Sequence, residues 1–235
     1  MEVHRGFDRL PVFRQTAVAV GSFDGVHRGH RLLIDRLNTL AHHELEAGSE
    51  SVVVTFDPHP RLVLRGSNRL LSTLDERLDL LAETGIDHVV VVRFTPEFSR
   101  IDSETFTRDY LQGRLRAVAV LSGDDHHFGR DRSGSTGALS RSGLQTARLG
   151  RYENISSTAV RAAVEAGEME TAAALLGGPY LIRTDPPHDP TKLLPPVGEY
   201  RVLLPDEDNR EVRLTVDRSL FLRDDRPRRL RILGK

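Results

Sequence analysis

The stretch AVAVGSFDGVHRGH, residues 17–30, decides the fold of this chain. A short apolar run leads into glycines and two histidines, and an amphipathic segment follows over residues 32–45. This order predicts a strand, a tight turn and a helix. Open α/β sheets bind phosphates at such a junction, because the helix N-terminus offers unpaired N–H groups and the positive end of its dipole.

Two residue types within this stretch suit a phosphate site. Gly25 and Gly29 permit close approach of the backbone to a ligand. His27 and His30 are three positions apart and share a face if the turn is already helical. Both imidazoles can then donate hydrogen bonds to negative charge that develops on a phosphate. A lone His-x-x-His pair is a weak signal, and core or solvated histidines are the alternative, so the surrounding pattern carries the hypothesis.

The same alternation of strand and helix continues along the chain. Val-rich apolar runs predict strands at 17–20, 51–56, 88–92 and 117–121, and helical patterns cover 31–46, 74–84, 103–115, 158–166 and 169–176. Ser103 is expected to cap one helix, and Ser72 or Thr73 another. The predicted fold class is therefore α/β, with a parallel sheet whose near-continuous apolar strands are covered on both faces.

The C-terminal part follows a different pattern. Five prolines within residues 183–196 predict a linker, and a period of two beyond it predicts antiparallel strands at 199–204, 211–216 and 229–233. Residues 206–209, DEDN, are expected to form the hairpin turn. We therefore predict a domain over 1–182, a Pro-rich linker over 183–196 and a small antiparallel β module over 197–235.

Composition excludes several functions. With 235 residues, 38% hydrophobic and 29% charged, the chain resembles a globular protein, and its net charge of −1 gives no argument for binding nucleic acid or an anionic membrane. The sequence has no cysteine, which excludes disulfides, thiolate catalysis and Cys-ligated metal. No signal peptide and no apolar run of membrane-spanning length is evident, so a cytoplasmic enzyme is expected.

Residues 21–30 have the wider form G-x-F-D-G-V-H-x-G-H, which resembles the FAD synthetase module of the bacterial bifunctional riboflavin kinase/FAD synthetases, a branch of the nucleotidylyltransferase superfamily. Three other segments match this family in the same order, over about residues 15–180. They are TFDPHP at 55–60, GDDHHFGRDRSG at 123–134 and SSTAVR at 156–161. His126 departs from the family, which has Phe at that position. The resemblance implies a Rossmann-like sheet and transfer of AMP from ATP to FMN, giving FAD and pyrophosphate.

The resemblance also implies roles for particular residues. His27, His30 and Arg161 would be catalytic; Gly21, Phe23, Asp24, Gly25, Gly29, Ser156, Ser157, Thr158 and Asp125 would bind ATP or its phosphates; Pro58, His59, Phe128 and Arg132 would bind FMN. Mg²⁺ would accompany the ATP phosphates. Each segment also has a simpler interpretation: 156–161 as a capped helix start, His59 as an incidental residue at a strand end, and residues 125–127 as a metal cluster.

Two alternatives stay open. The chain could be another small-molecule nucleotidylyltransferase, or a flavin- or nucleotide-binding protein without activity. The C-terminal module resembles a shortened, degenerate riboflavin kinase, because residues 189–192, DPTK, stand where that module carries G-x-P-T-A-N, a segment that binds Mg²⁺ and ATP. Riboflavin kinase activity is therefore expected to be absent.

Overall fold

The computed structural model describes residues 1–66, 69–123, 139, 141–150, 155–184, 189–217 and 229–235. These residues form two compact units. The first unit comprises the described residues within 1–23, 30–67 and 81–152, and the second comprises those within 24–29, 68–80 and 153–235. The chain therefore leaves the first unit and returns to it twice.

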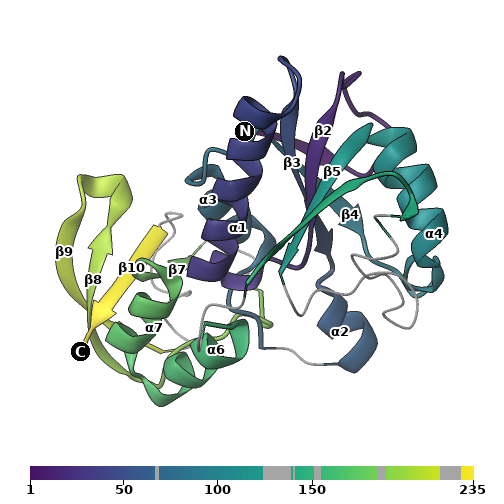
Figure 1. The fold of residues 1–235 in the computed structure, drawn as a ribbon. Helices are drawn as coiled ribbons and strands as arrows, with labels where there is room; N and C mark the ends of the chain where they lie inside the picture. Colours follow the sequence, from purple (N-terminus) through teal and green to yellow (C-terminus); the bar gives the residue numbers. More distant parts are fainter. Residues whose placement is uncertain (67–68, 124–138, 140, 151–154, 185–188, 218–228) are drawn as a thin grey trace. The chain divides into compact units, whose positions relative to one another are not determined.

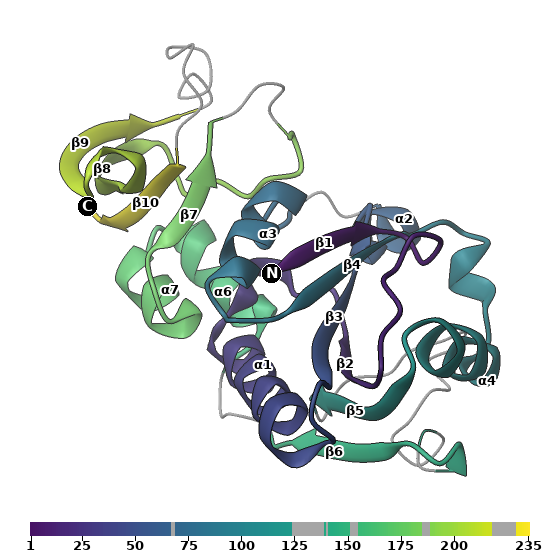
Figure 2. The ribbon, with the colours of Figure 1, turned by 90° about the horizontal axis from the view of Figure 1, so that it is seen from above.

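Six parallel strands form the sheet of the first unit, in the order β1-β4-β3-β2-β5-β6 (Figures 1 and 2). The four predicted strands are confirmed as β2 (Thr16–Val20), β3 (Glu50–Asp57), β4 (His88–Arg93) and β5 (Ala117–Gly123). Apart from Val118, their valines and alanines are almost fully buried, because helices cover both faces of a parallel sheet. The predicted α/β class with a parallel sheet is thus confirmed.

Two edge strands were not predicted. β1 (Glu2–Arg5) pairs with β4, and β6 (Gln145–Leu149) pairs with β5. Both are mostly polar and partly exposed, since an edge strand has a neighbour on one side alone. Such strands lack the apolar run by which the central strands are recognised in the sequence.

Helices flank this sheet. α1 (Arg28–Thr39) and α4 (Ser103–Thr105) with its continuation η4 (Phe106–Arg114) lie on opposite faces, as Figure 2 shows. The first unit also contains η2 (Leu40–Glu44), α2 (Pro60–Arg65) and η3 (Phe98–Arg100), whereas η1 (Asp24–Val26) and most of α3 (Leu74–Ala82) belong to the second unit. The helix predicted over 31–46 begins three residues earlier, and both η2 and η4 are wider, π-helical turns.

Helix caps test the local predictions. Ser103 does not cap α4: Asp102 does, because its Oδ1 accepts a hydrogen bond from Thr105 N at 2.8 Å. A carboxylate at this position also interacts favourably with the helix dipole. Thr73 caps α3 as predicted, with a bond of 3.2 Å from Glu76 N to Thr73 Oγ1 and a reciprocal bond of 2.9 Å from Thr73 N to Glu76 Oε2.

Besides η1 and most of α3, the second unit contains further helical segments and a four-stranded antiparallel sheet in the order β7-β10-β8-β9. The elements are α6 (Ser157–Ala166), α7 (Met169–Leu176), β7 (Tyr180–Arg183), β8 (Gly198–Leu204), η6 (Pro205–Glu207), β9 (Arg210–Val216) and β10 (Arg229–Gly234). The three predicted strands and the turn at 206–209 are confirmed, and Asp208 and Asn209 have the positive φ angles that the turn requires. β7 was not predicted.

One hydrophobic core joins the helices and strands of the second unit. It includes Leu71, Val160 and Val164 together with Val202 and Ile232. The division into units therefore does not follow the sequence boundaries at 182 and 196, because α6, α7 and β7 belong with the antiparallel sheet. Within the expected linker, Leu193 is buried and its carbonyl accepts a hydrogen bond of 2.7 Å from the Tyr180 hydroxyl.

Across the described part of the chain, the helices are too short or too polar to cross a lipid bilayer.

Candidate functional site

The predicted phosphate segment begins at the carboxyl end of β2. Gly21 N donates a hydrogen bond of 3.0 Å to Val54 O, and Thr55 Oγ1 donates one of 3.2 Å to Ser22 O. These bonds hold the start of the segment against the end of β3. Because β2 and β3 are parallel neighbours, the segments that begin at residues 21 and 55 start at the same, carboxyl edge of the sheet.

The backbone of this segment adopts unusual conformations. Gly25 has φ 76°, and two residues with side chains, Phe23 (φ 48°) and Val26 (φ 40°), also lie in the left-handed region. Such conformations cost on the order of 1–3 kcal/mol each and cluster at functional sites. Gly25 cannot be replaced without strain, because an added Cβ would lie 3.0 Å from Leu71 Cβ.

His30 lies in the first turn of α1, where the expected phosphate site begins. Its ring is partly buried, and its centroid lies 5.1 Å from that of the buried Phe23 ring. Phe23 thus contacts a residue of the expected site and is itself buried, and its contact with ATP stays a prediction.

His59 and Pro58 follow β3. His59 is buried and caps α2, because its Nδ1 accepts a hydrogen bond of 3.0 Å from Arg61 N. The neutral ring therefore carries its proton on Nε2. Pro58 is exposed, and the contacts of both residues with FMN stay predictions.

Asp24 is the centre of a hydrogen-bond network in the second unit. Its Oδ1 accepts bonds of 3.0 Å from Ser72 N and 3.3 Å from Ser72 Oγ, and its Oδ2 accepts one of 2.8 Å from Arg161 Nη2. Ser72 Oγ in turn accepts a bond of 2.9 Å from Gly25 N. Asp24 is 2% exposed, and a buried carboxylate with these donors is suited to position Arg161, while its predicted contact with ATP stays a prediction.

Helix α6 presents the other predicted phosphate residues. Ser156 is its N-cap and accepts a hydrogen bond of 3.1 Å from Ala159 N, which confirms the interpretation of 156–161 as a capped helix start. Ser157 Oγ donates a bond of 3.3 Å to Asp24 O, and Thr158 is exposed. Arg161 also donates from Nε to Arg69 O at 3.1 Å. The exposed hydroxyls and helix N-terminus can meet a phosphate.

The structure thus brings together Asp24, Gly25, Ser157 and Arg161 within the second unit. It adds Ser72 to this group, a residue that the sequence predicted only as a possible helix cap. The spacing of 48 residues between Asp24 and Ser72 explains the omission, because a serine before a helix has a sufficient local explanation. Asp125, Phe128 and Arg132 lie outside the described residues; β5, which precedes them, runs beside β2.

His27, which directly precedes α1, is buried. Burial lowers the pKa of its imidazole from 6.5 to about 4; the carboxylate of Asp24 opposes this effect, and Arg161 adds to it. The ring is therefore neutral near pH 7 and can donate one N–H. Gly29 gives it room, since an added Cβ there would lie 3.3 Å from the His27 ring.

This pKa predicts a pH-dependent stability. Between pH 6.5 and about 4 the unfolded chain binds a proton that folded His27 rejects, so the free energy of unfolding should fall by up to about 3 kcal/mol as the pH is lowered. The measurement is urea unfolding at several pH values. His27→Gln should lose this contribution, whereas the exposed His43→Gln should keep it. An identical pH dependence in wild type and His27→Gln would contradict the assignment.

The fold of the chain is also found in a solved structure. A solved structure described as a macrolide-efflux protein from Streptococcus pneumoniae superimposes with a TM-score of 0.79, covering 100% of this chain and 85% of that chain at 21% identity, which shows a shared fold. The model of the FAD synthetase family matches residues 11–159. The chain belongs to the FAD synthetase family.

Curated relatives agree with this family. A protein of Geobacillus thermodenitrificans, named provisionally as a bifunctional riboflavin kinase/FMN adenylyltransferase, is 37% identical over 76% of this chain and 98% of its own length. Bifunctional riboflavin kinase/FMN adenylyltransferases of Listeria monocytogenes and Escherichia coli are 34% and 35% identical over 69% and 77% of this chain. The chain spans 54% and 61% of the length of these two relatives.

Proposed function

We propose that this chain transfers AMP from ATP to FMN, producing FAD and pyrophosphate. The observation that carries the proposal is the segment 21–30, whose histidines stand at the start of α1 and whose Asp24 holds Arg161 at 2.8 Å beside the start of α6. The family match over residues 11–159 includes this segment and the first residues of α6. We propose that the chain acts as a globular cytoplasmic enzyme with ATP and FMN as its substrates.

The chemistry needs no covalent enzyme intermediate. An oxygen of the FMN phosphate attacks the α-phosphorus of ATP, and the bond from this phosphorus to the α,β-bridging oxygen breaks as pyrophosphate leaves. The protein has to position the two phosphates and stabilise the charge that develops. We assign hydrogen-bond donation to the α- and β-phosphates to His27 and His30, and contact with the β- and γ-phosphates to Ser157, Thr158 and Arg161.

ATP enters this reaction as its magnesium complex, so Mg²⁺ is part of the substrate. Asp24 does not suit the ion, because Ser72 and Arg161 already donate to its two carboxylate oxygens and the side chain is buried. The proposed carboxylate for a ribose hydroxyl or hydrated Mg²⁺ is therefore Asp125. Pro58, His59, Phe128 and Arg132 are proposed to bind FMN.

Riboflavin kinase activity is proposed to be absent. Lys192 stands in the segment that resembles the metal- and ATP-binding segment of the kinase, and its ammonium is buried in protein contacts. Nζ donates bonds of 2.7 Å to Leu71 O, Leu181 O and Glu76 Oε2 and lies 4.1 Å from the Tyr180 ring centroid. All three N–H groups are thus engaged, and a buried cation repels Mg²⁺ at this position.

Product analysis tests the whole proposal. Purified protein is incubated with ATP, Mg²⁺ and either FMN or riboflavin, and flavins are separated by chromatography. We expect FAD and pyrophosphate from FMN, and no FMN from riboflavin. FAD absent but flavin bound would favour the inactive binding protein; activity with a different phosphate acceptor would favour another nucleotidylyltransferase; FMN formed in proportion to enzyme would restore the kinase assignment.

Arg161→Lys separates binding from chemistry. The planar guanidinium of Arg161 donates hydrogen bonds to both Asp24 Oδ2 and Arg69 O. A lysine ammonium is a single point charge and cannot reproduce this geometry. We expect the Michaelis constant for ATP to rise about tenfold and the free energy of unfolding to fall by about 1 kcal/mol. Steady-state kinetics and urea unfolding measure both. Arg201→Lys, on an exposed ion pair with Glu211, is the control and should change neither. Unchanged ATP kinetics in Arg161→Lys would refute the assignment.

A further inference from the structure

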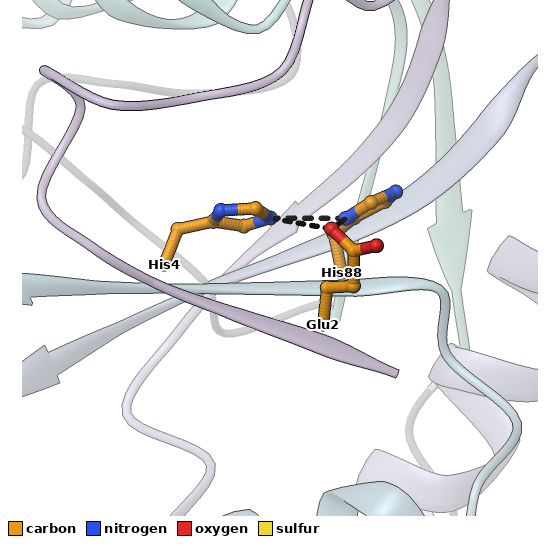
Figure 3. Close-up of side chains that lie close together, drawn as sticks. All are labelled: Glu2, His4 and His88. Atoms are coloured by element: carbon orange, nitrogen blue, oxygen red, sulfur yellow. Dashed lines mark hydrogen bonds and ion pairs between the residues drawn. The ribbon is translucent and has the colours of Figure 1, made fainter.

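A cluster of two histidines and a glutamate lies on the first unit, at the amino-terminal ends of β1 and β4. Glu2 and His4 are two positions apart on β1 and therefore point to the same face of the sheet. The parallel register pairs Glu2 with His88, the first residue of β4. Figure 3 shows the three side chains converging, with His4 Nε2, His88 Nδ1 and a Glu2 carboxylate oxygen directed toward one another.

The distances between these three atoms suit one metal ion. His4 Nε2 lies 3.0 Å from His88 Nδ1, and Glu2 Oε2 lies 3.9 Å from His4 Nε2 and 3.8 Å from His88 Nδ1. The point equidistant from all three atoms is about 2.1 Å from each, by plane geometry on these distances. Zinc binds imidazole nitrogen at roughly 2.0–2.1 Å and carboxylate oxygen at roughly 2.0–2.2 Å.

A second carboxylate orients one of the rings. His88 Nε2 forms a hydrogen bond of 2.9 Å with Glu50 Oε1, on the neighbouring strand β3. Nε2–H donates this hydrogen bond to the carboxylate, so the lone pair of the neutral ring is on Nδ1 and faces the cluster. This arrangement of carboxylate, histidine and metal is the usual outer shell of a zinc ligand.

The surroundings permit both retention and entry of an ion. Phe13 packs edge-on against His88, with ring centroids 5.1 Å apart, and the side chains of His88 and His4 are 7% and 11% exposed. Glu2 is 70% exposed, which leaves a path to solvent and room for a water as a fourth ligand.

We propose that Glu2, His4 and His88 bind a divalent transition-metal ion, with zinc as the best fit, and that the ion ties the edge strand β1 to β4. The cluster lies at the amino ends of the parallel strands, whereas segments 21–30 and 55–60 follow the carboxyl ends of β2 and β3. It is therefore separate from the residues proposed to act on ATP and FMN. Nitrogen and mixed nitrogen–oxygen ligands favour zinc over magnesium or calcium.

A simple hydrogen bond between the two rings is the competing explanation for the distance of 3.0 Å. It does not require the carboxylate of Glu2, an exposed side chain, to lie within 4 Å of both nitrogens. A test must therefore show that the ion binds and that Glu2 contributes.

The experiment uses full-length protein without a histidine tag, treated with EDTA and dialysed. Zinc is titrated in competition with a chromophoric chelator, and Co²⁺ is added separately to record its visible absorption. We expect wild type and the exposed control His43→Asn to bind one equivalent more of zinc than His4→Asn, and to give a Co²⁺ band that His4→Asn lacks. Glu2→Gln, at an exposed position, should weaken zinc binding at least tenfold without affecting folding.

Glu50→Gln should weaken binding roughly 10–100-fold, as for other residues that orient a metal ligand. Zinc should raise the melting temperature of wild type and not that of His4→Asn. Equal zinc stoichiometry and affinity in wild type, His4→Asn and Glu2→Gln would overturn the proposal, as would failure of wild type to bind zinc at micromolar concentration. FAD formation in Glu2→Gln should equal that of wild type, which keeps this test independent of the proposed function.

Discussion

Replacement of His30 by alanine is expected to lower the rate of FAD formation by at least about a hundredfold, the scale of losing one preorganised donor to transition-state charge. His30 stands in the first turn of α1, where backbone N–H groups are unpaired and the helix dipole is positive. The helix should persist without the imidazole, because the buried Leu33, Ile34 and Leu37 hold it in place.

The measurement is the turnover number with ATP and FMN at saturating concentrations, together with the melting temperature. A loss in turnover at nearly constant melting temperature would locate the effect in the chemical step. The matched control is His43→Ala, since His43 is also a histidine but is exposed. Turnover close to wild type in His30→Ala would remove this residue from the mechanism.

Lys192→Met should give the largest loss of stability, about 3–5 kcal/mol in the free energy of unfolding. The side chain of Lys192 is 4% exposed and that of Glu76, its partner, is fully buried. Burial lowers the pKa of Lys192, while the nearby carboxylate of Glu76 opposes this shift and favours the charged form. Methionine matches the volume of the aliphatic stem but leaves the buried carboxylate without its cation.

Lys235 provides the control, because Lys192 and Lys235 are the two lysines of the sequence and Lys235 is exposed. Lys235→Met should cost no more than about 1 kcal/mol. A double-mutant cycle with Glu76→Gln should show coupling of at least about 1 kcal/mol between residues 76 and 192. Strict additivity, or a stable Lys192→Met protein, would show that the pair does not stabilise the second unit.

The contacts of Lys192 could not be predicted from the sequence. The segment 189–192 was interpreted as a remnant of a kinase site inside a linker, on the basis of prolines and a partial motif. In the structure Lys192 joins residues of α3 and β7, with acceptors 116 and 11 positions away. A cation surrounded by carbonyl groups and a carboxylate cannot be distinguished from a surface lysine in a linear pattern, because its partners come from distant segments.

The functional segments divide in the same way. Residues 21–30 could be identified directly, since glycines, histidines and a preceding apolar run are contiguous. The hydrogen bonds of Asp24 could not be predicted from the sequence. In the structure its carboxylate accepts hydrogen bonds from Ser72 and Arg161, which lie 48 and 137 positions away. The prediction that Ser103 caps α4 was wrong by one position, because Asp102 and Ser103 are adjacent and both are favourable N-cap residues.

The sequence by itself determined the central valine-rich strands, the helices between them, the antiparallel C-terminal strands and the family, because periodicity and contiguous motifs are local properties. Tertiary structure alone decided the edge strands, the partners of Asp24 and Lys192, the core shared by α6 and the C-terminal sheet, and the convergence of Glu2 and His4 with His88. The physical reason is strand register and packing: parallel pairing brings together residues 84 positions apart, and no local pattern encodes that distance.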